Sequence, residues 1–272
     1  MDRAQLTRER QPSEAFVVRA SGVSLCGGRS SNQDSFLVLD DTNDVVRRRG
    51  AGQLFAVADG LGGHLGGGTA SRIAVETLVA YYDTPTDEPW ASGGARLGAI
   101  VRKAHEKVVR RAGEEPALAG MGTTLTAAVF GPTSVEFVHV GDSRLYRVRR
   151  GKAECLTLDH SFARRMQVEG IHPPEEYAEG PLGNALYRYV GKHPLQVDRG
   201  RSDLRGGDVF LLTTDGFHRT VDESTLEEEI ATPGASAEAL AKRLSGLCES
   251  NDPSDNATVV VITVETNRGN DV

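Results

Sequence analysis

The chain has little cysteine, and the three residues present form no recognised pattern. Cys26, Cys155 and Cys248 are odd in number and widely separated among 272 residues. That arrangement excludes a zinc-ligand spacing and a ladder of disulfides. Each cysteine lies in an apolar stretch of sequence, so we expect reduced thiols in the core of a cytoplasmic protein.

Long apolar runs are also lacking. No segment approaches the roughly 20 consecutive apolar residues of a membrane-spanning helix. The stretch from Met1 to Glu14 is polar and charged and lacks the apolar core of a signal peptide. We therefore expect a cytoplasmic protein without a membrane partner.

Basic clusters are few. Apart from Arg47-Arg48-Arg49 and Arg147-Arg149-Arg150 the chain has no Lys/Arg-rich run, and its formal net charge is −7. This argues against nucleic acid as a partner. The acidic surplus is what a chain with several cation-binding carboxylates would show, although solubility explains it equally well.

The order of apolar and polar stretches predicts strands in blocks and helices in pairs. Because strands and helices do not alternate regularly, an α+β sandwich is favoured over a doubly wound sheet. We expect a flexible lead-in over 1–14, a single domain over 15–266 with a mobile flap at about 161–190, and a tail over 267–272. Strands are predicted at 15–26, 35–39, 54–58, three in antiparallel succession within 123–149, and at 153–158, 208–214 and 256–264. Helices are predicted at 68–82, 95–112, 223–230 and 235–249, and a hairpin connection at 40–52.

Aspartates recur at the ends of the predicted apolar strands. The run Leu54 to Ala58 ends on Asp59-Gly60, and an ionised carboxylate buried at a strand end costs several kcal/mol unless a cation or donors compensate. Four further aspartates stand beside strands in the same way: Asp34, Asp142, Asp215 and Asp255. Singly, each is commonly a turn or cap residue. Together they indicate all-oxygen ligation of Mg²⁺ or Mn²⁺.

Several short motifs occur in an order that resembles a known family. They are Arg29-Ser30-Ser31-Asn32-Gln33-Asp34, Asp59-Gly60-Leu61-Gly62-Gly63-His64, Gly122-Thr123-Thr124, Val140-Gly141-Asp142-Ser143-Arg144, Asp159-His160-Ser161, Thr214-Asp215-Gly216 and Asp255-Asn256-Ala257-Thr258. The chain resembles the metal-dependent serine/threonine protein phosphatases of type 2C, in particular their bacterial branch, from about residue 17 to 265. The resemblance implies a four-layer sandwich: two antiparallel sheets packed face to face, flanked by helices, with the metals in a cleft at one end.

The resemblance also implies a role for each matching residue. Asp59 would bridge two metal ions, the Gly60 carbonyl would bind the first, and Asp215 and Asp255 would bind the second. A weaker third site would be formed by Asp142, Ser161 and Asp215. Asp34 would orient metal-bound water, and Arg29 would grip the substrate phosphate through a bidentate contact that lysine cannot make.

The implied activity is hydrolysis of phosphoserine and phosphothreonine in proteins, opposing a bacterial Ser/Thr kinase. Two Mn²⁺ or Mg²⁺ ions would lower the pKa of water from ~15.7 to near 7, so that a bridging hydroxide attacks phosphorus directly. A small-molecule phosphomonoesterase is an alternative within enzymes. A pseudophosphatase acting as a regulatory binding module is a second alternative. A catalytically inactive family member would, however, be expected to lack at least one of Asp59, Asp215 and Asp255.

Four departures from the family pattern bear on the site. Animal members have an acidic residue where this chain has Gln33, and a histidine where it has Leu61; bacterial members share both features. Phe217-His218-Arg219 replaces the Leu and small polar residues that usually follow the Asp-Gly pair, which would alter the cleft rim. In the flap, Gly180 and Gly183 stand where relatives commonly have His and Arg.

Overall fold

Two five-stranded antiparallel sheets form the centre of the molecule. The computed structural model describes residues 16–83, 93–171, 184–231 and 234–267. The first sheet has the order β1 (Phe16–Leu25), β12 (Ala257–Thr266), β11 (Val209–Thr213), β8 (Arg144–Arg149) and β9 (Lys152–Cys155). The second has the order β10 (Asp198–Asp203), β7 (Ser134–Val140), β6 (Leu125–Phe130), β3 (Gln53–Ala58) and β2 (Ser35–Leu39). A short pair, β4 (Gly60–Leu61) and β5 (Gly122–Thr123), follows the end of β3.

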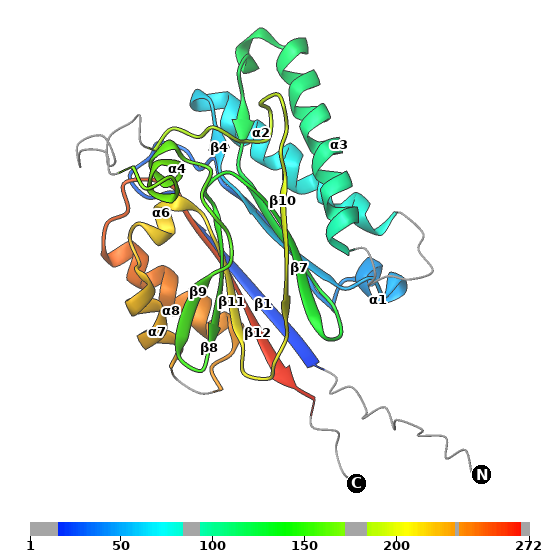
Figure 1. Cartoon of the computed structure of the whole chain (residues 1–272), viewed down its shortest axis with the longest axis vertical. Coiled ribbons are helices and arrows are strands. Elements are labelled where there is room, and N and C mark those ends of the chain that lie inside the picture. Colours follow the sequence, from blue (N-terminus) through cyan, green and yellow to red (C-terminus); the bar gives the residue numbers. More distant parts are fainter. Residues whose placement is uncertain (1–15, 84–92, 172–183, 232–233, 268–272) are drawn as a thin grey trace.

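Helices cover the outer face of each sheet (Figure 1). The second sheet is covered by α2 (Gly63–Leu78), which continues into η1 (Val79–Tyr82), and by α3 (Gly93–Glu114). The first sheet is covered by α7 (Glu223–Ile230) and α8 (Ala237–Ser250). The shorter helices are α1 (Asp44–Arg49), η2 (Pro116–Leu118), α4 (Phe162–Val168) and α6 (Asp215–His218). The four-layer sandwich implied by the resemblance is confirmed.

Three apolar cores hold the four layers together, and strand periodicity divides residues among them. Successive side chains on a strand point to opposite faces. In β3, Leu54 and Ala56 belong to the core under α2 and α3, whereas Phe55 and Val57 belong to the core between the sheets. The uninterrupted apolar run of this strand is therefore explained by burial on both faces.

Most predicted elements occur within a few residues of their expected positions. The stretch 40–52 is a hairpin connection as predicted, because the strands it joins, β2 and β3, pair antiparallel. It also contains α1, which was not predicted and whose first turn is capped by the Asn43 side chain accepting from Val45 N–H at 2.9 Å. The helix expected from residue 68 begins at Gly63. The glycine-rich run, which is typical of a loop, forms its first turns.

The strands between 123 and 149 are not three successive neighbours. β6 and β7 pair, but β8 pairs with β9 and β11 in the other sheet. The chain crosses between sheets at the turn Gly141–Ser143, which carries Asp142. β10 was not predicted, because its sequence Asp-Arg-Gly-Arg-Ser-Asp has no apolar alternation; it is an edge strand paired with β7.

The cysteine prediction is correct only in part. All three thiols are free, and Cys248 is buried, but Cys155 is half-buried and Cys26 is exposed. Burial in the core is therefore wrong for Cys26. The lead-in 1–14, the flap residues 172–183 and the tail from 268 lie outside the described residues, and the single-domain organisation stays a prediction.

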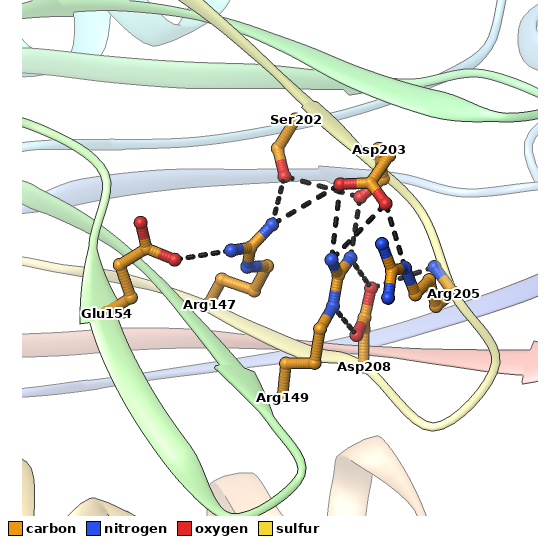
Figure 2. Close-up of polar contacts among 7 residues, drawn as sticks. All are labelled: Arg147, Arg149, Glu154, Ser202, Asp203, Arg205 and Asp208. Atoms are coloured by element: carbon orange, nitrogen blue, oxygen red, sulfur yellow. Dashed lines mark hydrogen bonds and ion pairs between the residues drawn. The ribbon is translucent and has the colours of Figure 1, made fainter.

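An ionic network joins the two sheets beside the β10–β11 connection (Figure 2). Arg149 on β8 donates from Nε and Nη2 to the two carboxylate oxygens of Asp208, both at 2.7 Å. Asp208 is 1 % exposed and also accepts from the Arg205 backbone N–H at 2.8 Å. Arg149 reaches Asp203 on β10 as well, at 3.2 Å. This network connects β10, an edge strand of one sheet, to β8, an interior strand of the other.

Candidate active site

The aspartates that follow or precede strands meet at one end of the sandwich. Antiparallel pairing sets the end of β11 beside the start of β12, and Ala58 at the end of β3 opposite Ser35 at the start of β2. A hollow of about 390 Å³ lies at this end. The predicted site residues that line it are Arg29, Asp59, Gly60, Asp215 and Asp255.

The Gly122-Thr123-Thr124 motif fixes the backbone of Asp59. Asp59 N–H donates to Thr124 Oγ1 at 2.8 Å, while its carbonyl oxygen accepts from Thr124 N–H at 2.9 Å and from Thr123 Oγ1 at 2.8 Å. The next residue must be glycine, because a Cβ at Gly60 would lie 2.3 Å from the carbonyl carbon of Gly67. The carboxylate and the Gly60 carbonyl are thus delivered by a rigid segment.

Asp34 lies among these carboxylates and is held from one side only. Its Oδ2 accepts from Thr214 Oγ1 at 2.8 Å and from Thr258 Oγ1 at 2.6 Å. Its Oδ1 is buried without a hydrogen-bond partner among the described residues, and the same is true of Asp215 Oδ1. Buried carboxylate oxygens normally have partners, so both atoms are suited to a cation or to water held by one.

Burial and mutual repulsion raise the pKa values of the clustered carboxyl groups. The pKa of Asp59 is raised well above its usual value by burial and then by the charges of Asp34, Asp215 and Asp142. Burial likewise raises the pKa of Asp34 to about 7, against the lowering effect of its two threonine donors. The pKa of Asp142 is raised to about 8 by burial and by Asp215 and Asp159. Such a cluster is stabilised in its ionised form by bound cations.

Arg29 faces Asp255 across the rim of the hollow. Its Nε and Nη2 donate to the two carboxylate oxygens at 2.8 and 2.6 Å. The loop that carries Arg29 is anchored by Asn256, whose Nδ2 donates to the carbonyl oxygens of Cys26 and Ser31 at 2.8 and 3.0 Å. The arginine side chain itself is 59 % exposed and accessible to a ligand.

The carboxylates are gathered but do not form a ready-made cage. Within the described ranges no three His, Cys, Asp or Glu side chains stand in metal-binding geometry. Both oxygens of Asp255 contact Arg29. The donor set nevertheless fits hard divalent cations: it consists of carboxylate and carbonyl oxygens, and Mg²⁺ or Mn²⁺ in such sites keeps several waters as further ligands.

Asp142 and Ser161 line a second, neighbouring hollow of about 380 Å³. Asp142 follows Gly141, which has φ 114° and donates its N–H to His160 Nδ1 at 3.0 Å. The Ser161 hydroxyl accepts from Arg164 N–H at 3.3 Å as the N-cap of α4. Of the three residues predicted for a third metal site, Asp142 and Ser161 line this second hollow, whereas Asp215 lines the main one.

The sequence did not lead us to predict the arginine side chain that lies beside Asp142 and Asp215. The guanidinium of Arg219 is 3.1 Å from Asp215 and 3.8 Å from Asp142, both measured from Nη2 to Oδ2. The only signal in the sequence is the unusual Phe217-His218-Arg219 after the Asp-Gly pair. The structural roles of Asn256, Thr214 and Thr258 were also missed, although two of the motifs contain these residues. Gln33 and Leu61, where animal enzymes differ, both line the main hollow.

Comparisons with known proteins agree with this arrangement. A profile of the protein phosphatase 2C family matches residues 22–249. The serine/threonine protein phosphatase PstP of Mycobacterium tuberculosis is 34 % identical over 235 residues, 86 % of this chain but only 44 % of PstP. The chain thus spans less than half of that relative. The protein phosphatase PhpP of Streptococcus pneumoniae is 30 % identical over 238 residues, 87 % of this chain and 93 % of PhpP.

Solved structures agree as well. The catalytic domain of PstP in complex with two manganese ions superposes with a TM-score of 0.77 at 33 % identity, covering 92 % of this chain and 99 % of that one. The Streptococcus agalactiae serine/threonine phosphatase gives 0.80 at 28 % identity, covering 92 % and 100 %. Within the described part of the chain, no helix has the length and apolar character needed to span a membrane.

Proposed function

The chain belongs to the protein phosphatase 2C family, and from this premise we propose that it is a metal-dependent phosphatase that hydrolyses phosphoserine and phosphothreonine in proteins. Water adds to phosphorus while the bond to the serine or threonine oxygen breaks, and that oxygen takes up a proton. The substrate proteins are those phosphorylated by a Ser/Thr kinase, whose action the enzyme opposes.

One observation carries the proposal. Asp59, Asp215 and Asp255, which are far apart in sequence, line one hollow together with an arginine and the Gly60 carbonyl. Two buried carboxylate oxygens, Asp34 Oδ1 and Asp215 Oδ1, have no hydrogen-bond partner in the part of the chain that the structure describes. A structural cluster of acidic side chains would instead pair each of these oxygens with a donor.

We assign the two cations, Mn²⁺ or Mg²⁺, to Asp59, the Gly60 carbonyl, Asp215 and Asp255. When bound, such ions lower the pKa of coordinated water to near 7 and polarise the phosphoryl group. Asp255 would exchange its contact with Arg29 for a cation. Arg29 would then be free to bind two oxygens of the substrate phosphate in the same bidentate manner.

Asp34 is the group best placed to hold a water proton. Thr214 and Thr258 fix the carboxyl group through Oδ2, which leaves Oδ1 directed at no protein donor among the described residues. Oδ1 can therefore accept a hydrogen bond from water and orient its oxygen toward phosphorus. The two threonines keep this acceptor in position during the reaction.

The direct experiment measures turnover of phosphoserine and phosphothreonine peptides with and without Mn²⁺, for the wild type and for Asp59→Asn. We expect Mn²⁺-dependent turnover that Asp59→Asn reduces by about 10³-fold or more, as removal of a central catalytic group does. Asp41→Asn, a change at an exposed aspartate paired with Arg19, is the matched control and should retain activity.

Four results would contradict the proposal. Turnover that needs no metal, or an unaffected Asp59→Asn enzyme, would remove the metal mechanism. Turnover of small phosphomonoesters but not of peptides would favour a metabolite phosphatase. Mn²⁺ binding without any turnover would favour a regulatory binding module.

A further inference from the structure

Arg219 stands one helical turn after Asp215, at the end of α6. Its backbone N–H donates to the Asp215 carbonyl at 2.9 Å, so the two residues are on the same side of a single turn. An acidic residue four positions before an arginine is the favourable orientation for an ion pair on a helix. The local geometry of this turn therefore places the guanidinium close to Asp215.

The tertiary fold then adds a second carboxylate. Asp142, from the crossing between the sheets, is 3.8 Å from the same nitrogen that is 3.1 Å from Asp215. The two carboxylate side chains are only 10 % and 13 % exposed, whereas Arg219 is 48 % exposed. Arg219 also donates to Asn184 Oδ1 at 3.4 Å on the flap side. One cation thus contacts two poorly solvated anions.

The neighbouring arginines contact other residues. Arg144 forms a two-point pair with Asp159 at 2.9 and 2.7 Å. Arg164 lines the same hollow but reaches Gln167 at 3.1 Å. Among the described residues, Arg219 is the basic side chain that forms ion pairs with both Asp142 and Asp215.

We propose that Arg219 is a built-in counter-cation for the Asp142–Asp215 pair and limits the chain to two divalent cations, in place of the third that the family resemblance implies. The inference rests on the proposed function, because it presumes that Asp215 serves the two-metal centre. A divalent ion held by Asp142 and Asp215 would lie within a few ångströms of the guanidinium, and the like charges would repel each other beside carboxylates that are only 10 % and 13 % exposed. Arg29 has to give up one carboxylate, Asp255, to the two-metal centre, whereas a third ion would have to displace Arg219 from two carboxylates.

The test counts bound Mn²⁺. Titration of the purified chain is followed by the loss of the free Mn²⁺ electron paramagnetic resonance signal and by metal analysis after equilibrium dialysis. We expect about two ions per chain for the wild type and about three for Arg219→Ala, the third lost again in Arg219→Ala/Asp142→Asn. Arg219→Lys should stay at about two, since the charge is kept.

Matched variants make each outcome decisive. Arg164→Ala removes an arginine from the same hollow and should bind about two ions, so a third ion in this variant would mean a general electrostatic effect and refute the specific role of Arg219. Arg219→Gln replaces Arg219→Ala if the latter does not fold. A wild type with three ions that loses one in Asp142→Asn, or an Arg219→Ala or Arg219→Gln protein that stays at two, overturns the inference.

The outcomes separate this inference from the proposed function. A wild type that binds two ions and hydrolyses phosphopeptides, together with an Arg219→Ala protein that gains no ion, refutes only the role of Arg219. A wild type that binds no Mn²⁺ refutes both.

Discussion

Arg29 offers a prediction in which metal binding and substrate binding should respond differently. The guanidinium contacts both oxygens of Asp255 at 2.8 and 2.6 Å, but its side chain is 59 % exposed and that of Asp255 is 34 % exposed. Exposed ion pairs of this kind contribute about 0.5–1 kcal/mol. Arg29→Ala releases Asp255 from this pair, so the apparent Mn²⁺ affinity should rise, by no more than about 2- to 5-fold.

Arg29→Ala should weaken substrate binding, and this loss should be larger than the gain in Mn²⁺ affinity. A two-point contact between arginine and a phosphate dianion contributes about 2–3 kcal/mol. Its loss predicts a fall in kcat/KM for a phosphopeptide of about 30- to 150-fold. Arg29→Lys should recover only part of the loss, because a lysine ammonium cannot make both contacts.

The assay measures kcat/KM and the apparent Mn²⁺ dissociation constant on the same preparations. Arg19→Ala is the matched control, since Arg19 forms a similar exposed pair with Asp41 at 2.7 Å and does not line the hollow. Parallel losses of Mn²⁺ affinity and of kcat/KM in Arg29→Ala would refute the assignment, because they would make Arg29 a structural support of the metal site.

Three further outcomes are expected. Arg149→Met should lower the free energy of unfolding in urea by about 3–5 kcal/mol, because it leaves the 1 % exposed carboxylate of Asp208 without its arginine partner. A loss below about 1 kcal/mol would show that this ion pair is dispensable. With EDTA present, the protein should lose about 2 kcal/mol of stability from pH 6.5 to 8. The cause is the raised pKa values of Asp142, about 8, and Asp34, about 7, since the folded state binds protons there that the unfolded state has released. Asp142→Asn should reduce this slope, and an unchanged slope would show that Asp142 does not contribute to it. Gly60→Ala should cost roughly 1–3 kcal/mol and weaken Mn²⁺ binding, because its Cβ would meet the Gly67 backbone at 2.3 Å; wild-type Mn²⁺ affinity would show that the Gly60 carbonyl is not a ligand.

Local patterns in the sequence determined the strands, the main helices and the chemical type of the site. The run Leu54 to Ala58 predicts a buried strand because its residues are apolar on both faces, and the structure buries all five. Asp59 after this run predicts an oxygen-donor site. The family resemblance then implied the four layers. The local errors have local causes: β10 carries no apolar alternation, and the glycines at the start of α2 are typical of loops.

Only the tertiary structure decided how distant residues combine. Thr258 contacts Asp34 although the two are 224 positions apart in sequence, and no spacing rule predicts such a contact. The crossing between the sheets at Asp142 brings that carboxylate to Arg219. The unusual Phe217-His218-Arg219 marks the arginine in the sequence, but not its partner Asp142. Periodicity and turn chemistry are properties of neighbours along the chain. The pairing of charges across the site depends instead on which strand ends the packed sheets bring together.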